Sequence, residues 1–144
     1  MEFKDHFSGH ANLYREARPL YPDILFDWLT QQAPDTERVC DCGCGNGQAT
    51  RALAQHFQYV IGTDPSAAQI AAASAHQRIE YRVEPAEHSS FANRSISLIT
   101  VAQALHWFDL EKFYSEARRV LKPGGVVAVW TYAECQVTPT IDAI

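Results

Sequence analysis

The sequence contains no run of about 18 apolar residues, the length that a membrane-spanning helix needs. Its first residues, MEFKDHFSGH, have no apolar segment after the charges and do not resemble a secretory signal. Positive charge is also scarce, because 12 lysines and arginines stand against 17 aspartates and glutamates, for a net charge of −5. A basic face that could neutralise nucleic acid phosphates is therefore not expected. These absences predict a cytoplasmic protein with neither a membrane nor a nucleic acid as its partner.

The chain also lacks internal repeats, low-complexity stretches and any polar linker between two apolar halves. Its 144 residues, 47% of them apolar, are enough for one soluble domain with a hydrophobic core. We therefore predict a single domain over residues 1–144, with an N-terminal helical segment at 1–35 and a core at 36–144.

Within the core, short apolar segments alternate with helical patterns. Strands are predicted at 38–43, 59–64, 79–83, 95–102 and 126–132, and helices at 21–34, 48–57, 67–77 and 110–121. Ser66 and Asp109 are expected N-caps, Pro34 ends the first helix, and KPGG at 122–125 forms a turn. Strands that alternate with helices in this way favour an α/β fold, in which helices cover both faces of a doubly wound, mostly parallel sheet.

Three helices show an apolar stripe that should face the sheet. The expected inward residues are Leu25, Trp28 and Leu29 in the first helix; Ala49, Ala52, Leu53, His56 and Phe57 in the second; and Leu110, Phe113, Tyr114, Ala117, Val120 and Leu121 in the last.

The segment VCDCGCGNGQAT, residues 39–50, follows the first predicted strand, where an open parallel sheet binds its ligand. A dinucleotide site would have the pattern G-x-G-x-x-G, but position 48 is Gln48 and the spacing is G-x-G-x-G. Asp41 precedes the glycines and is expected at the mouth of the loop, where its charge would repel a pyrophosphate. A nicotinamide cofactor is therefore disfavoured, and a ligand that carries positive charge is favoured.

The segment DCGCGNG resembles the first motif of class I S-adenosylmethionine-dependent methyltransferases, an acid followed by G-x-G-x-G. Downstream, EPAEHSSF is similar to the family's turn after the third strand, and ITVAQALHWF and LKPGGVVAVW resemble the fourth- and fifth-strand motifs of its trans-aconitate-type branch. The opening HFSGHANLYREARPLYP resembles the leading segment that caps the cofactor. The resemblance implies a methyltransferase with a Rossmann-like sheet of strand order 3-2-1-4-5, acting on a small molecule, with carboxylates among the candidate acceptors.

The same resemblance implies a set of site residues. Asp64 would accept hydrogen bonds from both ribose hydroxyls, Ala86 and Glu87 would lie beside the adenine, and His106 is a candidate base that packing alone would also explain. Tyr14 and Arg18 would contact a carboxylate, although a surface arginine that anchors a helix is an equal alternative. The implied cofactor-binding set is Asp41, Gly43, Cys44, Gly45, Gly47, Asp64, Pro65, Ser66, Ala86, Glu87, Gln103, Tyr14 and Arg18.

The sequence departs from the family pattern in two residues and in length. Ser97 stands where the branch commonly has aspartate, and Glu84 where it has glycine. The family sheet has seven strands, whereas the sequence provides five. If the chain is complete, the fifth strand would be an exposed edge able to pair in a homodimer; a truncated protein is the alternative reading of the same difference. A non-catalytic S-adenosylmethionine-binding module, acting through a partner or dimer, is therefore the alternative to an enzyme.

The cysteines are expected to be thiols. Cys40 and Cys42 should point to one face of their strand, away from Asp41, as core residues. Cys44 lies in the loop, and the spacing C-x-C-x-C does not match a structural zinc site, so no metal is predicted.

Overall fold

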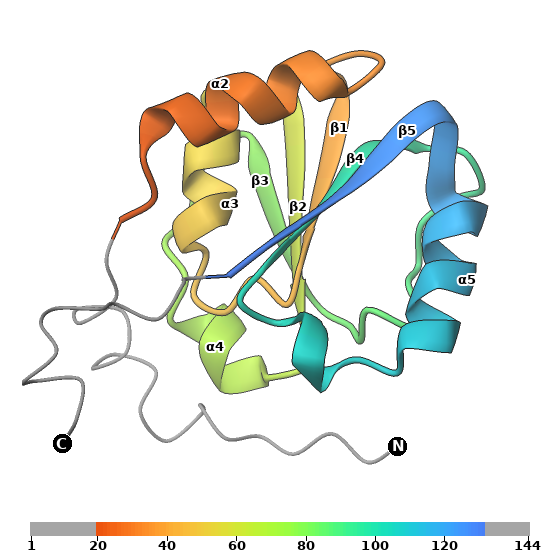
Figure 1. Cartoon of the computed structure of the whole chain (residues 1–144). Helices are drawn as coiled ribbons and strands as arrows, with labels where there is room; N and C mark the ends of the chain where they lie inside the picture. The colour runs from red at the N-terminus through yellow and green to blue at the C-terminus, as the bar shows by residue number, and fades with distance from the viewer. Residues whose placement is uncertain (1–19, 132–144) are drawn as a thin grey trace, which may run out of the picture.

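The computed structural model describes residues 20–131 (Figure 1). Its main elements, in chain order, are α2 (Asp23–Gln32), β1 (Arg38–Cys42), α3 (Gln48–Leu53), β2 (Tyr59–Asp64), α4 (Ala67–Ala71), β3 (Ile79–Val83), β4 (Ile96–Ala102), the 3₁₀ helix η2 (Leu105–Trp107), α5 (Leu110–Val120) and β5 (Leu121–Trp130). None of the helices within this range is long and apolar enough to cross a bilayer.

The five strands form one sheet in the order β3-β2-β1-β4-β5, and every neighbouring pair is parallel. This confirms the predicted fold class and strand order. Because the strands are parallel, their carboxyl ends share one edge, where β1, β2 and β4 end at Cys42, Asp64 and Ala102. The loops at that edge build the candidate site.

Two apolar clusters cover the two faces of the sheet. On one face, α2 and α3 pack through Phe26 and Leu53 against strand residues that include Val39. On the other, α5 packs through Phe113 against residues that include Cys40 (Figure 1). Adjacent residues of β1 thus face opposite helical layers, as the alternation of a strand requires.

The prediction of which residues of the first helix face the sheet is partly wrong. Phe26 and Leu29 are buried, whereas Trp28 is 55% exposed. The helix packs with Phe26 against Tyr21 and Trp130, in edge contacts of 6.4 and 6.3 Å between ring centroids. That aromatic contact rotates the helix so that Trp28 points outward.

Two predicted helices are shorter in the structure. α3 ends at Leu53, although the chain makes one further turn in which His56 N–H donates to the Leu53 carbonyl, and Phe57 remains buried. α4 ends at Ala71 instead of continuing to 77. Beyond it, His76 Nδ1 accepts the Arg78 N–H at 3.0 Å, a local bond that competes with helix continuation.

The last helix and strand that the structure describes also differ from the prediction. α5 ends at Val120, and its outer residues Leu110 and Tyr114 are 48% and 37% exposed, because only one stripe of the helix meets the sheet. β5 begins at Leu121, before the KPGG turn. The turn bulges out of the strand, since Ile96 pairs with Leu121 while Leu98 pairs with Val126.

The Glu116 carboxylate, partly buried on α5, fastens that helix to the turn after β3. Glu116 Oε1 accepts from Arg119 Nη2 at 2.5 Å, from Ser89 N–H at 2.9 Å and from Ser89 Oγ at 2.6 Å. The Arg119 guanidinium, with help from Ser89, lowers the pKa of Glu116 to about 2 although burial acts the other way. The carboxylate therefore stabilises the fold fully above its ordinary pKa of 4.5, and this contribution is lost as the pH falls towards 2.

We expect Glu116→Gln to lower the free energy of unfolding by about 1.5–3 kcal/mol at pH 7, the range for hydrogen bonds to a charged group. At pH 3 the difference in stability should be smaller, because part of the stabilisation by the ionised Glu116 is already lost in the wild type. Urea unfolding at both pH values measures it, with Glu111→Gln on the exposed side of the same helix as the control. Equal stability of Glu116→Gln and wild type at pH 7 would contradict the assignment.

Candidate functional site

The loop between β1 and α3 lies at the carboxyl edge of the sheet and is held by its main chain. Cys44 N–H donates to the Thr63 carbonyl of β2 at 2.9 Å, and Gly47 N–H donates to the Cys44 carbonyl at 3.0 Å. Gly43, Gly45 and Gly47 have φ values of 67°, 56° and 90°. All three occupy the left-handed region, where residues with a Cβ are strained, so the loop needs its glycines.

The glycines differ in what surrounds them. A Cβ on Gly43 would lie 2.7 Å from the side chain of Ala104, and a Cβ on Gly47 would lie 2.2 Å from the Tyr81 hydroxyl. Internal packing therefore leaves no space for a Cβ at either position. At Gly45 the nearest such atom is Gln69 Oε1, 3.7 Å away, which is an ordinary contact. Packing alone does not require the bare main chain at Gly45. Its φ of 56° favours glycine there, and the space above it would also let a ligand lie directly on this part of the loop.

Asp64, the last residue of β2, is 8% exposed and holds the loop through its carboxylate. Its Oδ2 accepts the Gly45 N–H at 2.9 Å, and its Oδ1 accepts the Ser66 N–H at 2.8 Å. Pro65 lies between them, and Ser66 caps α4 as predicted, its Oγ accepting the Gln69 N–H. An ionised carboxylate is acceptor-only and offers about four lone-pair positions.

Asp41 is 1% exposed, and its carboxylate lies inside the fold instead of at the mouth of the loop. Oδ2 accepts from Thr50 Oγ1 at 2.7 Å, and Oδ1 accepts from Thr100 Oγ1 at 2.9 Å. These bonds tie β1 to α3 and β4 directly below the glycines. Asp41 thus positions the loop, and its contact with a cationic ligand stays a prediction.

The turn after β3 contains the two residues expected beside an adenine. Ala86 is 7% exposed and packs into the core on the α5 face. Glu87 Oε1 accepts the Asp109 N–H at 2.8 Å, which pins this turn to the start of α5. Asp109 in turn caps that helix, as predicted, by accepting the Lys112 N–H. The adenine contact stays a prediction for both residues.

The segment after β4 lies against the glycine loop, since Phe108 would be 3.3 Å from a Cβ on Gly43. His106 is exposed, and its ring stacks at a tilt on Trp107 with 4.6 Å between centroids. Trp107 is itself 40% exposed, whereas Phe108 packs on Phe113. The exposure leaves His106 accessible to a ligand, and a role as base stays a prediction. Tyr14 and Arg18 lie outside the described residues.

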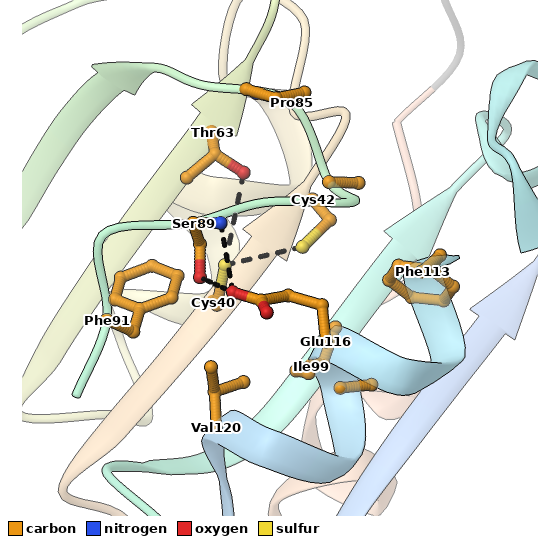
Figure 2. Close-up of a pocket in the computed structure, with 12 residues that line it drawn as sticks. Cys40, Cys42, Thr63, Pro85, Ser89, Phe91, Ile99, Phe113, Glu116 and Val120 are labelled. Carbon is orange, nitrogen blue, oxygen red and sulfur yellow. Dashed lines mark hydrogen bonds between the residues drawn. The ribbon is translucent and has the colours of Figure 1, made fainter. Parts of the chain in front are cut away.

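Cys40 and Cys42 are buried free thiols whose sulfurs lie 3.4 Å apart on one face of β1, as predicted (Figure 2). The hydrogen bond to the Cys42 thiol, together with burial, raises the pKa of Cys40 well above its ordinary value, so it stays protonated. Both residues line a cavity of about 10 Å³ between the sheet and α5, near Ser89 and Glu116. It has room for about one water molecule, so it is not a nucleoside pocket.

The sequence analysis missed Tyr81, which supports the loop from β3. Its ring crosses Gly62 of β2, where a Cβ would lie 2.9 Å from it, and its hydroxyl reaches the underside of Gly47. Burial raises the pKa of Tyr81 to about 12. The glycine inside the strand VIGTD was the available signal, because a strand glycine often marks the close approach of another group.

Residues 40–129 match the family model described as a methyltransferase domain. The chain belongs to the methyltransferase-domain family. This confirms the predicted methyltransferase family, and the trans-aconitate-type branch stays a prediction.

Individual relatives agree with the family. A putative methyltransferase of Dictyostelium discoideum is 38% identical over 143 residues, which cover 99% of this chain and 54% of the relative. A probable S-adenosylmethionine-dependent methyltransferase of Saccharomyces cerevisiae is 31% identical, over 84% of this chain and 45% of the relative's length. The solved structure of a putative type II methyltransferase from Anaeromyxobacter dehalogenans superposes with a TM-score of 0.81 at 47% identity, over 88% of this chain and 54% of that one. The chain thus spans about half the length of the curated relatives it matches.

Proposed function

We propose that this chain binds S-adenosylmethionine and transfers its methyl group to a small molecule, with a carboxylate among the candidate acceptors. One observation supports this most directly. At the carboxyl edge, the Asp64 carboxylate is fixed between the N–H groups of Gly45 and Ser66, beside a main chain kept bare at Gly45. The site thus combines an acceptor-only group suited to a vicinal diol with a loop that a ligand can approach closely.

In this proposal the chain's own residues bind and orient, and the cofactor supplies a methyl group on an already activated sulfonium. Asp64 holds the ribose, the main chain at Gly43, Gly45 and Gly47 supports the cofactor, and Asp41 contributes a buried negative charge below it. The bound geometry can account for about 7–11 kcal/mol of the barrier, because methyl transfer depends mainly on alignment.

His106 is the candidate for a proton acceptor at the methyl acceptor, since it is exposed in the segment that packs on the glycine loop. A carboxylate acceptor would need no base, and His106 would then serve only as a contact. Cys44, Pro65, Ser66, Ala86, Glu87 and Gln103, together with Tyr14 and Arg18 of the leading segment, complete the proposed site.

A non-catalytic binding module is the second candidate, supported by the outer edge of the sheet. Within residues 20–131, β5 pairs only with β4, and Val129 on it is 43% exposed. Such an edge can pair with a second copy of the chain. Size-exclusion chromatography with light scattering tests this, because a strict monomer at all concentrations would argue against pairing at β5.

We further propose one domain over residues 1–144, with 1–35 as a cap, and a cytosolic location. A reducing compartment suits the buried free thiols of Cys40, Cys42 and Cys44.

Calorimetric titration with S-adenosylhomocysteine, the expected product, tests the proposal, with NAD as the control ligand. We expect saturable binding of S-adenosylhomocysteine alone. Once binding is established, a screen of carboxylate and amine acceptors identifies the reaction. Failure to bind S-adenosylhomocysteine, or equal binding of NAD, would remove the proposed site.

A further inference from the structure

The outer side of α2, at the periphery of the fold, carries large apolar side chains that the described residues leave exposed (Figure 1). Leu20 and Ile24 are 84% and 74% exposed, and Trp28 is also turned outward. Ile24 and Trp28 are four residues apart, the spacing that places two side chains on the same side of a helix. Single exposed apolar residues are common, but a row of three large ones is typical of an interaction site. We call Leu20, Ile24 and Trp28 the outer stripe.

Acidic side chains border the outer stripe. Asp23 and Asp27 are both exposed, and α2 contains no lysine, arginine or histidine. The imidazole of His56 lies 3.7 Å from Asp27, and it offsets that charge only when it is protonated. A segment that covers the outer stripe should therefore combine apolar side chains with positive charge.

The size of the outer stripe argues against a second copy of the chain as its partner. A stable interface between two proteins buries about 800 Å² and roughly 20–30 residues on each side. The outer stripe offers three large apolar residues on and just before a helix of 10 residues. Two copies would also bring their aspartates together, and like charges oppose association. A segment of the same chain needs fewer contacts, because its covalent connection removes most of the cost of association.

Two segments of this chain lie outside the described residues and begin or end near α2. Residues 1–19 lead directly into Leu20, the first described residue. Residues 132–144 follow the end of β5, where Trp130 contacts Tyr21 with 5.6 Å between ring centroids. Both segments are thus connected to the fold close to the outer stripe.

Charge distinguishes the two segments. Residues 132–144 contain Glu134 and Asp142 and no lysine, arginine or histidine, so the aspartates of α2 would repel them. In the first segment, Lys4 lies between Phe3 and Phe7. The two phenylalanines are four residues apart, the same spacing as that of the two apolar residues within α2. The first segment therefore matches the outer stripe in both charge and apolar spacing.

We propose that residues 1–13 dock on the outer stripe, with Phe3 and Phe7 against Ile24 and Trp28 and with Lys4 near the aspartates of α2. The occupant is thus a segment of this chain, held by apolar contacts and by charge.

This docking anchors the leading segment beside the candidate site. Tyr21, just before α2, contacts Trp130, and Trp130 pairs with the last residue of β4 at the carboxyl edge of the sheet. The chain between the docked segment and α2 would then pass this edge, where Tyr14 and Arg18 are proposed to act. The docking itself does not depend on the cofactor, because both partners belong to the chain.

Urea unfolding of the 144-residue chain tests whether the outer stripe is covered. Replacing an uncovered surface residue changes the unfolding equilibrium constant by no more than about twofold. We expect Trp28→Gln to raise this constant about 5- to 30-fold, because the tryptophan would lose its contacts with the docked segment. Leu110→Gln is the matched control, since Leu110 is also an exposed apolar residue on a helix and lies outside the outer stripe. The control should stay within about twofold of wild type.

A double-variant comparison identifies the occupant. Phe7→Ser alone should raise the unfolding constant about as much as Trp28→Gln does. The combined variant should raise it little more than either alone, because both substitutions remove the same contact. Phe7→Ser combined with Leu110→Gln should instead show the product of the two single effects. Each unfolding curve is measured at two protein concentrations, and its midpoint should not change.

Four outcomes would overturn the inference. An unchanged unfolding constant in Trp28→Gln would mean that the outer stripe is uncovered. Independent effects of Phe7→Ser and Trp28→Gln would assign it to another occupant, such as residues 132–144. A midpoint that rises with protein concentration would identify a second copy of the chain. Equal coupling of Phe7→Ser to Leu110→Gln would mean that the segment has no preferred docking surface.

Discussion

Asp64→Ala is expected to weaken binding of S-adenosylhomocysteine by about 1.5–3 kcal/mol, roughly tenfold to a hundredfold in Kd. The substitution removes the carboxylate proposed to accept the ribose hydroxyls. It also leaves two N–H groups without their acceptor, that of Gly45 in the glycine loop and that of Ser66 before α4. Calorimetric titration measures the affinity, and a thermal melt without ligand separates binding from stability.

The control is Asp27→Ala, because this acid is 60% exposed on α2 and lies outside the proposed site. A second comparison uses an S-adenosylhomocysteine analogue that lacks both ribose hydroxyls. Wild type should lose affinity for the analogue, whereas Asp64→Ala should bind the two ligands nearly equally. If the folded variant discriminates between them as strongly as wild type, Asp64 does not hold the ribose.

The sequence predicted the sheet well because two independent signals agreed. The buried strands are short apolar runs, and residues such as Gly43 and Ser66 mark the loops and caps between them. Alternation of strands and helices then restricts the topology strongly, since crossovers between parallel strands are right-handed and short. The strand order 3-2-1-4-5 followed from the family resemblance and is the order observed.

The sequence could not give the direction of side chains that depend on distant partners. Trp28 fits an inward stripe by spacing, but the contacts of Phe26 with Tyr21 and Trp130 decide the rotation of α2. Asp41 illustrates the same limit in the site. Its position predicted a charge at the mouth of the loop, whereas the hydroxyls of Thr50 and Thr100, nine and 59 residues away, hold it inside.

Gly47→Ala should be among the most destabilising single substitutions in the loop. Its φ of 90° disfavours any residue with a Cβ, and the added methyl group would lie 2.2 Å from the Tyr81 hydroxyl. Backbone strain and overpacking together predict a loss of about 2–5 kcal/mol in the free energy of unfolding, measured by urea denaturation. Adding Tyr81→Phe should recover part of this loss, because it removes the hydroxyl that clashes most. The recovery should be partial, since the ring would still lie 2.9 Å from the new Cβ.

Gly45→Ala is the matched control, because it also has a positive φ but its nearest atom, Gln69 Oε1, is 3.7 Å from the new Cβ. We expect a smaller stability loss than at Gly47, about 1–2 kcal/mol from the backbone alone, and no rescue by Tyr81→Phe. Its larger effect should be on S-adenosylhomocysteine binding, since the methyl group would occupy the space proposed for the ligand. Equal destabilisation at both positions, with ligand affinity unchanged at Gly45, would mean that the loop's own conformation and packing determine these glycines. The opposite pattern would assign Gly47 to the support of the loop and Gly45 to its contact with the cofactor.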